Sequence, residues 1–383
     1  MSEQELPRPA KVTIAFLIRM LNDGGAQRQL CELVRAMDKT RFRVCVVAMY
    51  EGGRFKAEIE SIPDVELITI GKRHTWDVVG ALLRLVREMK RIRPQILHGY
   101  LDLGNVLSVF LKPFLPNVKV VWGLRNAGIQ LKKESRAGKI LAELERHLSR
   151  YPDLFVANSN AGQTYHVSIG YPEDRFIVIQ NGTNTLKFAP DPLARQQMRE
   201  AWGVLPDSPL IGIAGRIAPE KDHVTFLKAA GEVNNHRSEC RYCIIGGGDE
   251  EDVAKLKLLA ESLGIAEKVI WTGSFSEMNR AYNALDLLAL TSQSEGFPNV
   301  VGEAMATGVP VVVTDVGDVR TLVNNTNVIC PPGDASRVAA TMLNVLASLS
   351  YPPPDLRLRE QIEQNFSLDA LRRKTEEALW KII

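Results

Sequence analysis

Short runs of apolar residues alternate with amphipathic segments along the first half of the chain. We predict strands over 12–18, 42–48, 65–70, 95–98, 118–122, 154–157 and 176–179, with helical segments between most of them. Buried apolar strands separated by helices are typical of a parallel sheet that carries helices on both faces. The hydrophobic pattern therefore predicts an α/β domain in this half.

The same pattern starts again after a stretch rich in proline and aspartate at 184–208. Strands are predicted over 210–214, 242–245, 269–271, 287–290 and 309–313, which indicates a second α/β domain on the same plan. Successive prolines at 352–354 end this alternation, and two further helices are predicted beyond them. We therefore divide the chain into domains 1–190 and 191–350 and a helical segment 351–383.

The composition agrees with this organisation. With 383 residues, 45% of them apolar and 24% charged, the chain is long enough for two globular domains with full cores. The amino-terminal residues show no basic segment followed by an apolar run, and no apolar stretch reaches the length of a membrane span, so we expect a cytoplasmic protein. Cys240 and Cys243 lie beside and within a predicted strand, so we expect core residues rather than metal ligands or a redox pair.

Charge is divided unequally between the two halves, although the net charge is only +2. Residues 1–190 contain 28 Lys and Arg against 19 Asp and Glu, whereas residues 191–383 contain 19 against 26. Two segments concentrate the basic side chains, namely Arg84, Arg87, Lys90, Arg91 and Arg93, and then Lys132, Lys133, Arg136 and Lys139. They form either an ordinary solvated face or a surface for anionic lipid headgroups, which attract each nearby charge by about 1 kcal/mol. No aromatic residues are interleaved with them, so nucleic acid is not an expected partner.

Ligands of open parallel sheets bind at the carboxyl ends of the strands, and four loops place suitable groups there. The first is the turn of Gly24 and Gly25, where the backbone can approach a phosphate and the following helix points its amides toward it. An ordinary strand-to-helix turn accounts for these glycines equally well. The second loop holds Arg216 and Lys221, a planar fork and a point charge that can converge on one diphosphate.

The other two loops follow the strands predicted at 242–245 and 287–290. Gly246 opens a glycine-rich turn that does not match the dinucleotide pattern but indicates close backbone approach. The run Ser294-Glu295-Gly296-Phe297-Pro298 leads into a helix predicted to begin near Asn299, and Glu303 lies about one turn inside it. A helix amino terminus attracts an anion, and a carboxylate suits a pair of ribose hydroxyls.

These motifs, in this order, resemble family 4 of the retaining glycosyltransferases, which have the GT-B fold of two Rossmann-like domains facing each other across a cleft. The signature is the run Glu-Gly-Phe-Pro-Asn-Val-Val-Gly-Glu at 295–303, in which seven residues separate two glutamates. The glycine turn at 24–25, the cationic loop at 215–222 and the glycine turn at 246–249 agree with the family in order and approximate spacing. The resemblance covers at least residues 12–345.

The resemblance implies an enzyme that transfers a hexosyl or N-acetylhexosaminyl group from a nucleotide-sugar, with UDP the expected nucleotide, to a saccharide or lipid-linked acceptor. The implied pathway makes bacterial polysaccharide, lipopolysaccharide or glycolipid at the inner face of the cytoplasmic membrane. The first domain would bind the acceptor and the second the donor, and the segment 351–383 would cross back to the first domain. No cofactor or metal is expected, because the chain has no Asp-x-Asp to clamp a metal on the diphosphate.

The resemblance also implies roles for individual residues, which fall into three groups. Arg216 and Lys221 would bind the diphosphate and stabilise its charge as it leaves, and Glu295 would face the transferred sugar. The donor would be held by Gly24, Gly25 and Gly246, by the backbone amides of Phe297, Asn299 and Val300, and by Glu303 at the ribose hydroxyls. His98, Tyr100 and Asn105 are candidates for contacts with the acceptor or the transferred sugar.

Two positions depart from the family pattern. Many relatives carry an active-site histidine shortly after the fourth strand, and Tyr100 occupies that place here. His98 is interpreted either as a strand-end histidine with satisfied hydrogen bonds or as a catalytic group. Asn184 replaces the aspartate of the family's Asn-Gly-x-Asp turn, an exchange that concerns the turn more than the chemistry.

Three other classes of protein agree less well with these residues. A sugar-nucleotide epimerase shares the fold, but the combination of Arg216, Lys221 and the paired glutamates favours transfer. An NAD-dependent dehydrogenase is disfavoured because no Gly-x-Gly-x-x-Gly follows a strand and no acidic residue ends the second strand. An inactive scaffold subunit is expected to have lost Lys221 or one of the two glutamates, and all three are present.

Overall fold

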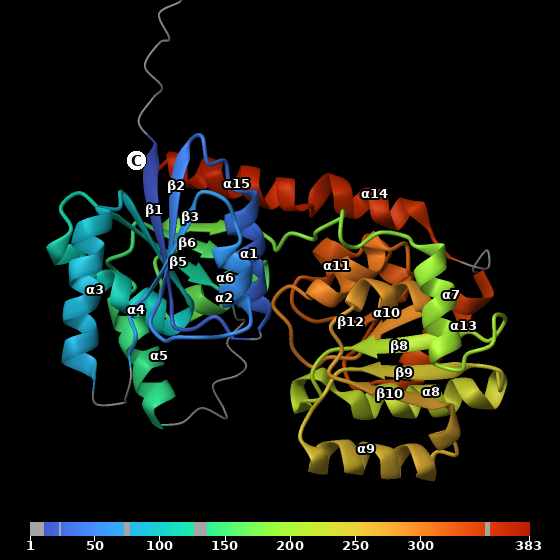
Figure 1. Cartoon of the computed structure of the whole chain (residues 1–383). Coiled ribbons are helices and arrows are strands. Elements are labelled where there is room, and N and C mark those ends of the chain that lie inside the picture. Colours follow the sequence, from blue (N-terminus) through green and yellow to red (C-terminus); the bar gives the residue numbers. More distant parts are fainter. Residues whose placement is uncertain (1–10, 23, 73–76, 126–135, 349–352) are drawn as a thin grey trace, which may run out of the picture. The chain divides into compact units, whose positions relative to one another are not determined.

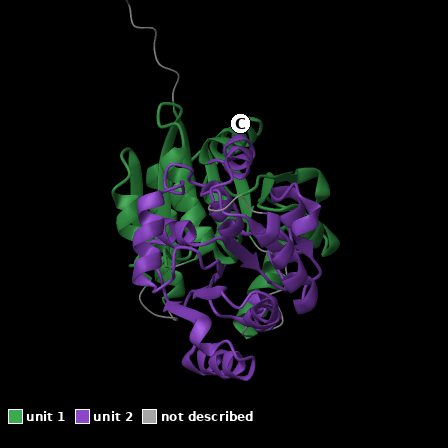
Figure 2. Ribbon diagram, turned by 90° about the vertical axis from the view of Figure 1, so that its right-hand side faces the viewer, with its two compact units in different colours: residues 1–182, 368–383 green, residues 183–367 purple. Residues whose placement is uncertain are grey.

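The computed structural model describes residues 11–22, 24–72, 77–125, 136–348 and 353–383. The chain forms two compact units, residues 1–182 with 368–383 and residues 183–367 (Figure 2). Each unit is built on a parallel sheet with helices on both faces (Figure 1), as the hydrophobic pattern predicts. Among the described residues, no helix combines the length and the hydrophobicity that crossing a membrane requires.

In unit 1, seven parallel strands lie in the order β3-β2-β1-β4-β5-β6-β7. Their bounds are β1 (Val12–Ile18), β2 (Phe42–Ala48), β3 (Val65–Thr69), β4 (Ile96–Tyr100), β5 (Lys119–Leu124), β6 (Leu154–Ala157) and β7 (Phe176–Val178). The helices are α1 (Gly25–Ala36), α2 (Phe55–Glu60), α3 (Val78–Ile92), α4 (Leu101–Leu111), α5 (Arg136–Leu148), α6 (Asn160–Ser168) and α15 (Leu368–Trp380). Apolar side chains of α1, α2 and α15 pack on one face of the sheet, and those of α3 and α4 pack on the other.

Unit 2 repeats this plan with six parallel strands in the order β10-β9-β8-β11-β12-β13. Their bounds are β8 (Leu210–Ala214), β9 (Arg241–Ile245), β10 (Val269–Gly273), β11 (Leu287–Leu290), β12 (Val311–Thr314) and β13 (Ile329–Cys330). The helices are α7 (Pro192–Ala201), α8 (His223–His236), α9 (Glu250–Ser262), α10 (Met278–Ala284), α11 (Asn299–Ala306), α12 (Val319–Leu322), α13 (Ala335–Ser348) and α14 (Leu356–Asn365). One face of the sheet packs against α8, α9 and α13, and the other against α7, α10, α11, α12 and α14.

The boundary between the units differs from the one predicted at 190/191. The Thr183 amide donates to the Phe366 carbonyl at 2.7 Å, and Phe188 is buried in the core of unit 2. Residues from Thr183 onward therefore belong to unit 2, because their backbone and side chains are bonded there. The prolines and aspartates of 184–208 suggested a linker, but this segment contains α7 and buries Phe188 and Met198 in the core of unit 2.

The segment 351–383, predicted as a third part of the chain that joins the first domain, is divided between the two units. Ile362 of α14 is fully buried in the core of unit 2, and Arg359 Nη1 donates to the carbonyls of Phe188 and Ala306 at 3.0 and 2.9 Å. Helix α14 thus completes unit 2, and only 368–383 joins unit 1. Both helices have an apolar face, and the sequence pattern alone does not say which core that face completes.

Cys240 and Cys243 lie in the core of unit 2, as the strand pattern predicts. Burial raises the pKa of the Cys240 thiol to about 11, so this side chain stays a neutral, unreactive thiol at physiological pH. Across the described ranges, no group of three or more His, Cys, Asp or Glu side chains is arranged to hold a metal ion.

Candidate functional site

Two neighbouring strands in the middle of the unit 2 sheet carry the main loops of the candidate site. β8 and β11 lie side by side, although β9 and β10 separate them in sequence. The strand order reverses between them, and at such a point the loops beyond the carboxyl ends diverge and leave room for a ligand. The loop after β8 holds Arg216 and Lys221, and the loop after β11 holds Glu295.

Lys221 and Glu295 form an ion pair at this edge of the sheet. Lys221 Nζ lies 2.6 Å from Glu295 Oε1, and the Ser292 hydroxyl donates to the same oxygen at 2.7 Å. The Lys221 side chain is 26% exposed and that of Glu295 is 11% exposed, so both are largely shielded from water. The structure therefore brings together two residues that the sequence assigned to the site. It adds Ser292, which no motif indicated.

Hydrogen bonds between the two loops fix the positions of Lys221 and Glu295 relative to each other. The Gln293 amide donates to the Glu220 carbonyl at 2.8 Å, and the Thr291 hydroxyl donates to the Asp222 carbonyl at 2.9 Å. Asp222 adopts a left-handed backbone with φ of 50° and caps α8, accepting a hydrogen bond from the Thr225 amide at 3.1 Å. Lys221 is thus fixed between a strand end and a capped helix, which limits how far its ammonium group can move.

Arg216 lies apart from the Lys221–Glu295 pair. Its side chain is 74% exposed, and Nη2 contacts Glu220 Oε1 at 3.1 Å. An exposed pair of this kind contributes little to stability, because water screens both charges. The guanidinium group therefore needs little energy to leave Glu220 and bind an incoming anion.

The glycine turn after β9 has a packing function. Gly246 has φ of 155°, and a Cβ added there would collide with the Gly215 carbonyl oxygen. The Ile217 amide also donates to the Gly247 carbonyl at 2.8 Å. The loops after β8 and β9 thus meet backbone to backbone, which requires glycine at this position. The assignment of Gly246 to the donor stays a prediction.

Helix α11 begins at Asn299, where the sequence predicts it. Phe297 is 5% exposed and packs against Phe366 with 5.6 Å between ring centroids, so its side chain anchors the turn before the helix. Pro298 is the N-cap and provides no side-chain hydrogen bond to the first turn. The first-turn amides of Asn299 and Val300 lie at the end of the helix that attracts anions.

Glu303 lies inside unit 2 rather than at its surface. It is 4% exposed, and Oε2 accepts a hydrogen bond from the Tyr282 hydroxyl at 2.8 Å. Tyr282 is fully buried on α10, and sequence reasoning did not single it out. No local signal could have identified it, since the contact joins two helices that the chain forms separately. The hydrogen bond fixes the direction of the carboxylate.

In unit 1, the turn after β1 was predicted to approach the donor. Gly24 is the N-cap of α1 in an extended conformation, and Gly25 is the first residue of the helix. Both glycines are exposed, and Asp23 lies outside the described residues. The nearest atoms that a Cβ at Gly24 would meet belong to the flexible Gln27 side chain. The fold of unit 1 alone therefore does not require glycine at position 24.

His98 and Tyr100 are core residues of unit 1, which corrects the interpretation of a histidine with satisfied hydrogen bonds. Both are 0% exposed, and neither ring nitrogen of His98 has a hydrogen-bond partner among the described residues. His98 packs between Phe16 and Tyr100, with ring centroids 5.1 and 5.7 Å away. Burial, assisted by the charge of Arg125, lowers the pKa of His98 to about 3, so the imidazole is neutral at physiological pH. This placement does not support a catalytic role for His98.

Asn105 is not beside His98 and Tyr100. A Cβ on Gly99 would lie 2.6 Å from Asn105 Cα, so α4 packs directly on the β4 backbone. Alternation along β4 directs Gly99 to the opposite face of the sheet from His98 and Tyr100. Asn105 Nδ2 donates to Glu145 Oε1 at 2.7 Å on the α4 side, a buried bond within unit 1.

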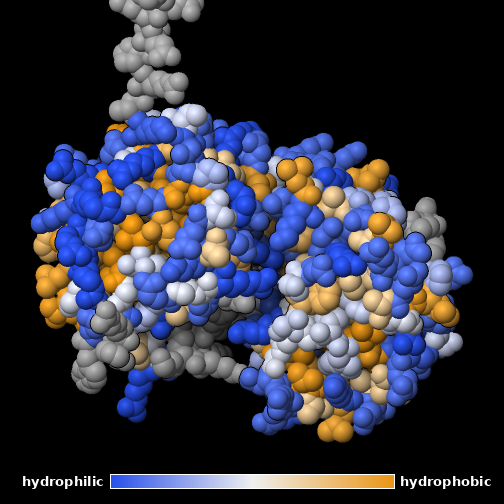
Figure 3. Space-filling view, viewed as in Figure 1, coloured by the Kyte–Doolittle hydropathy of each residue, from blue (hydrophilic) through white to orange (hydrophobic). Residues whose placement is uncertain are grey.

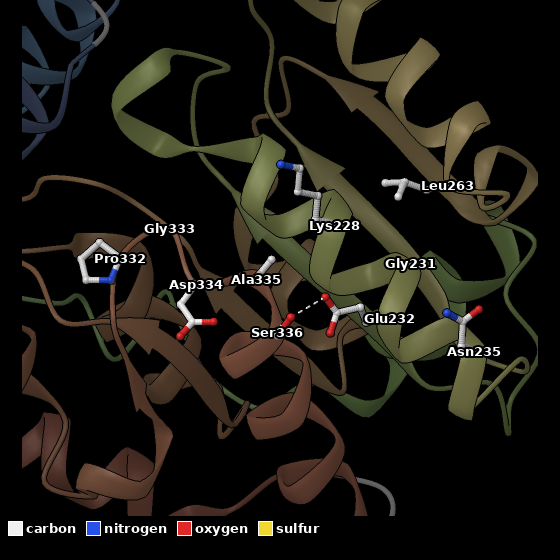
Figure 4. A pocket seen from close by; sticks show the side chains of 10 residues that line it. All are labelled: Lys228, Gly231, Glu232, Asn235, Leu263, Pro332, Gly333, Asp334, Ala335 and Ser336. Carbon is white, nitrogen blue, oxygen red and sulfur yellow. Dashed lines mark hydrogen bonds between the residues drawn. The ribbon is translucent and has the colours of Figure 1, made fainter.

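Unit 2 also has a surface pocket (Figure 4). It is formed by α8 and the loop that leads into α13, with Lys228, Glu232 and Asp334 among its lining residues. The Ser336 hydroxyl donates to Glu232 Oε1 at 2.8 Å across it. None of the predicted site residues lines this pocket, so we do not assign the donor to it.

Two family models match the chain. A model described as glycosyl transferases group 1 matches residues 194–365, and a model described as glycosyltransferase family 4 matches residues 23–186. The first range falls within unit 2, and the second covers most of unit 1.

Curated relatives align with part of the chain. A GDP-mannose-dependent alpha-mannosyltransferase of Mycobacterium tuberculosis is 33% identical over 197 residues, which cover 49% of this chain and 47% of the relative. A D-inositol 3-phosphate glycosyltransferase of Nocardia farcinica is 32% identical over 47% of this chain and 42% of its own length. The lipopolysaccharide core biosynthesis mannosyltransferase LpsB of Rhizobium meliloti is 32% identical over 46% and 50%. The chain thus spans about half the length of these relatives or less.

Solved structures match both units. Anabaena Alr3699/HepE in complex with UDP has a TM-score of 0.82 and 21% sequence identity, and the match covers 97% of this chain and 100% of that one. WaaG, a glycosyltransferase involved in lipopolysaccharide biosynthesis, has a TM-score of 0.67 and 16% identity, with 94% and 98% covered. At these identities the likeness establishes the fold, two Rossmann-like units.

Proposed function

The chain belongs to the group 1 glycosyltransferases with the GT-B fold, and on this premise we propose that it transfers a sugar from a nucleotide-sugar to an acceptor with retention of configuration. The observation that supports this most is the Lys221–Glu295 pair at the carboxyl ends of β8 and β11. A shielded ammonium group at the place where a phosphate leaves, with a carboxylate beside it, suits glycosyl transfer. The relatives named above are transferases, so we do not propose the epimerase alternative.

In the proposed reaction, an acceptor hydroxyl oxygen bonds to the anomeric carbon of the donor sugar. The bond from that carbon to the diphosphate oxygen breaks, its electron pair stays on the phosphate, and the hydroxyl proton leaves with the phosphate. Lys221 and Arg216 stabilise the negative charge that develops on the diphosphate. Glu295 faces the sugar, and its hydrogen bond from Ser292 helps to hold the carboxylate in place.

The remaining site residues are proposed to hold the donor. Glu303, oriented by Tyr282, binds the ribose hydroxyls, and the first-turn amides of α11 face sugar and phosphate. We propose no metal, since two cationic side chains and a helix terminus can supply the charge that a metal otherwise provides. Gly24 and Gly25 are proposed to approach the donor phosphates from unit 1.

The donor nucleotide is proposed to be UDP, as the sequence resemblance implies. The Mycobacterium tuberculosis relative is named as GDP-mannose-dependent, which makes GDP the competing nucleotide. We propose a hexosyl or N-acetylhexosaminyl group as the transferred unit. The proposed acceptor is a saccharide or lipid-linked saccharide of a surface glycan or glycolipid.

Donor binding and transfer can be tested with a panel of UDP- and GDP-sugars. One of them is expected to raise the melting temperature selectively, because a ligand at about 100 times its Kd stabilises the folded state by about 2.7 kcal/mol. The same compound should release its nucleoside diphosphate when an acceptor is added, and EDTA should leave the rate unchanged. If no nucleotide-sugar stabilises the protein, the proposed function is wrong. Activity that EDTA abolishes and magnesium restores would contradict metal independence.

A peripheral contact with anionic membranes is proposed for one face of unit 1, which we call the α3–α5 face. Its apolar members are Val78, Val79, Leu83, Phe110, Phe114 and Ile140, all at least 47% exposed, and its basic members are Arg87, Lys90, Lys112 and Lys139. Lys90 Nζ lies 5.8 Å from the centroid of the Phe114 ring, so basic and apolar groups adjoin there. Figure 3 shows hydrophobic side chains beside hydrophilic ones on the α3 side of unit 1. Lys132 and Lys133 lie outside the described residues.

Vesicle flotation tests this contact. The protein is expected to float with anionic vesicles, and the bound fraction should fall as the Debye length shrinks from about 10 Å at 0.1 M salt to about 3 Å at 1 M. Arg87→Glu with Lys90→Glu should reduce binding, because like charges then face the lipid. Lys255→Glu with Lys257→Glu on α9 of unit 2 is the matched control and should bind normally. Equal binding to neutral vesicles would contradict the electrostatic contact.

A further inference from the structure

Buried polar atoms without partners gather at one edge of the unit 1 sheet. Eleven buried side-chain nitrogen and oxygen atoms of the described residues have no hydrogen-bond partner. Five of them lie on or directly after the neighbouring strands β4, β5 and β6, namely both ring nitrogens of His98, the Tyr100 hydroxyl, Arg125 Nε and Asn158 Oδ1. The Tyr100 hydroxyl lies beside the Arg125 guanidinium group and interacts with it. Such atoms are rare in folded proteins, because each costs about 1–3 kcal/mol when left unbonded. Their concentration at a carboxyl edge indicates a site that a polar ligand completes.

Arg125 is the charged member of this group and directly follows β5. Its guanidinium carbon lies 4.6 Å from the centroid of the Tyr100 ring, and Nη1 donates to Asn181 Oδ1 at 3.2 Å. In the part of the chain that the structure describes, no carboxylate forms an ion pair with it. A partly buried guanidinium group is ordinarily paired with a carboxylate. Among the described residues, Arg125 therefore has no ion pair that an incoming anion would have to break.

The backbone around Tyr100 is shaped to hold the ring under Arg125. Leu101 has φ of 65°, a conformation that costs a bulky residue about 1–3 kcal/mol and that concentrates at ligand sites. Gly123 pairs with Tyr100 across the sheet, and a Cβ there would lie 3.2 Å from Tyr100 Cδ2 and from His98 Nε2. The missing side chain at Gly123 thus leaves room for both rings. Strain and space together keep Tyr100 in place as the surface on which Arg125 stacks.

We propose that Arg125, stacked on Tyr100, binds a phosphate or carboxylate group of the acceptor substrate. The planar guanidinium fork matches two oxygens of such a group. The hydrogen bond from Arg125 Nη1 to Asn181 Oδ1 fixes the orientation of the guanidinium group. This inference rests on the proposed function, because that function assigns the acceptor to unit 1. It adds that the acceptor is anionic.

The donor also carries phosphates, so the experiment must separate the two sources. The probe is inorganic phosphate, with acetate as the carboxylate probe and chloride at equal ionic strength as the reference. The background is the Arg216→Ala, Lys221→Ala double variant, which lacks the cationic side chains proposed to bind the donor diphosphate. In this background, phosphate or acetate is expected to raise the melting temperature above the chloride reference, and Arg125→Met should remove that increment. Arg125→Lys should keep only part of it, because the charge remains while the fork is lost.

Arg150→Met is the matched control. Arg150 also lies over a tyrosine ring, 5.8 Å from the centroid of Tyr151, but it precedes β6 at the opposite edge of the same sheet. This variant should keep the full increment. An increment that survives Arg125→Met, or the absence of any increment with either probe, would overturn the proposal.

A second measurement assigns the source of the anion. UDP and GDP are added to wild type and to Arg125→Met, and their stabilisation should be equal in the two proteins. If Arg125→Met instead weakens nucleoside diphosphate binding, the anion belongs to the donor, and the acceptor assignment is wrong. If neither nucleotide stabilises wild type while phosphate still acts through Arg125, the proposed function fails and the anion site stands.

Discussion

Replacement of Lys221 by alanine is expected to lower kcat by about 100- to 1,000-fold, the range seen when one preorganised electrostatic donor is removed from an active site. Lys221 Nζ lies 2.6 Å from Glu295 in a position largely shielded from water. Charge that develops on a leaving diphosphate is stabilised more strongly there than in bulk solvent. Because the interaction is stronger in the transition state than with bound substrate, the loss should appear in kcat more than in KM.

Steady-state kinetics with the donor selected by the nucleotide-sugar panel would measure this effect. Arg216→Ala belongs in the same experiment, since Arg216 is proposed to bind the same diphosphate. Lys228→Ala removes an exposed lysine on the neighbouring helix α8 and is the matched control, expected to keep its rate. Near-normal kcat in a folded Lys221→Ala variant would contradict the assignment of this residue.

Removal of residues 368–383 is expected to unfold unit 1 or to lower its melting temperature severely. Helix α15 buries Leu371, Ala378 and Leu379 in the core of unit 1. Burying a leucine side chain contributes about 1.5–3 kcal/mol, so two of them amount to a large share of the 5–15 kcal/mol that stabilises a typical domain. The buried Glu376 carboxylate also accepts a hydrogen bond from the Asp38 amide at 2.8 Å, and the truncation would remove that bond as well.

A point variant keeps this prediction measurable if the truncated chain does not fold. Leu379→Ala is expected to cost about 2–5 kcal/mol, the usual range for a buried leucine. Glu377→Ala, an exposed neighbour on the same helix, should change the melting temperature little. A truncated protein that melts at the wild-type temperature would show that α15 is only an appendage.

The strands and the two-unit plan were readable from the sequence because buried parallel strands need continuous apolar runs. Of the thirteen strands in the described residues, twelve overlap such runs, although β4, β5 and β10 each end two residues later than predicted. The missed strand, β13, has only two residues and no run to detect. The boundary at Gly182 was missed because it depends on which core Phe188 and Thr183 join. That choice involves contacts with residues far along the chain.

The sequence by itself indicated the candidate donor-site residues, through motifs that follow β1, β8, β9 and β11. Only the tertiary structure decided which of them meet. Lys221 and Glu295 touch because β8 and β11 are neighbours, while Arg216 turns to Glu220 instead. Likewise, Glu303 accepts a hydrogen bond from Tyr282, and Arg125 donates one to Asn181. Each of these bonds joins two separate segments of the chain. Residue type and spacing specify local chemistry, but burial and pairing across strands depend on how separately formed elements pack, and no local pattern records that.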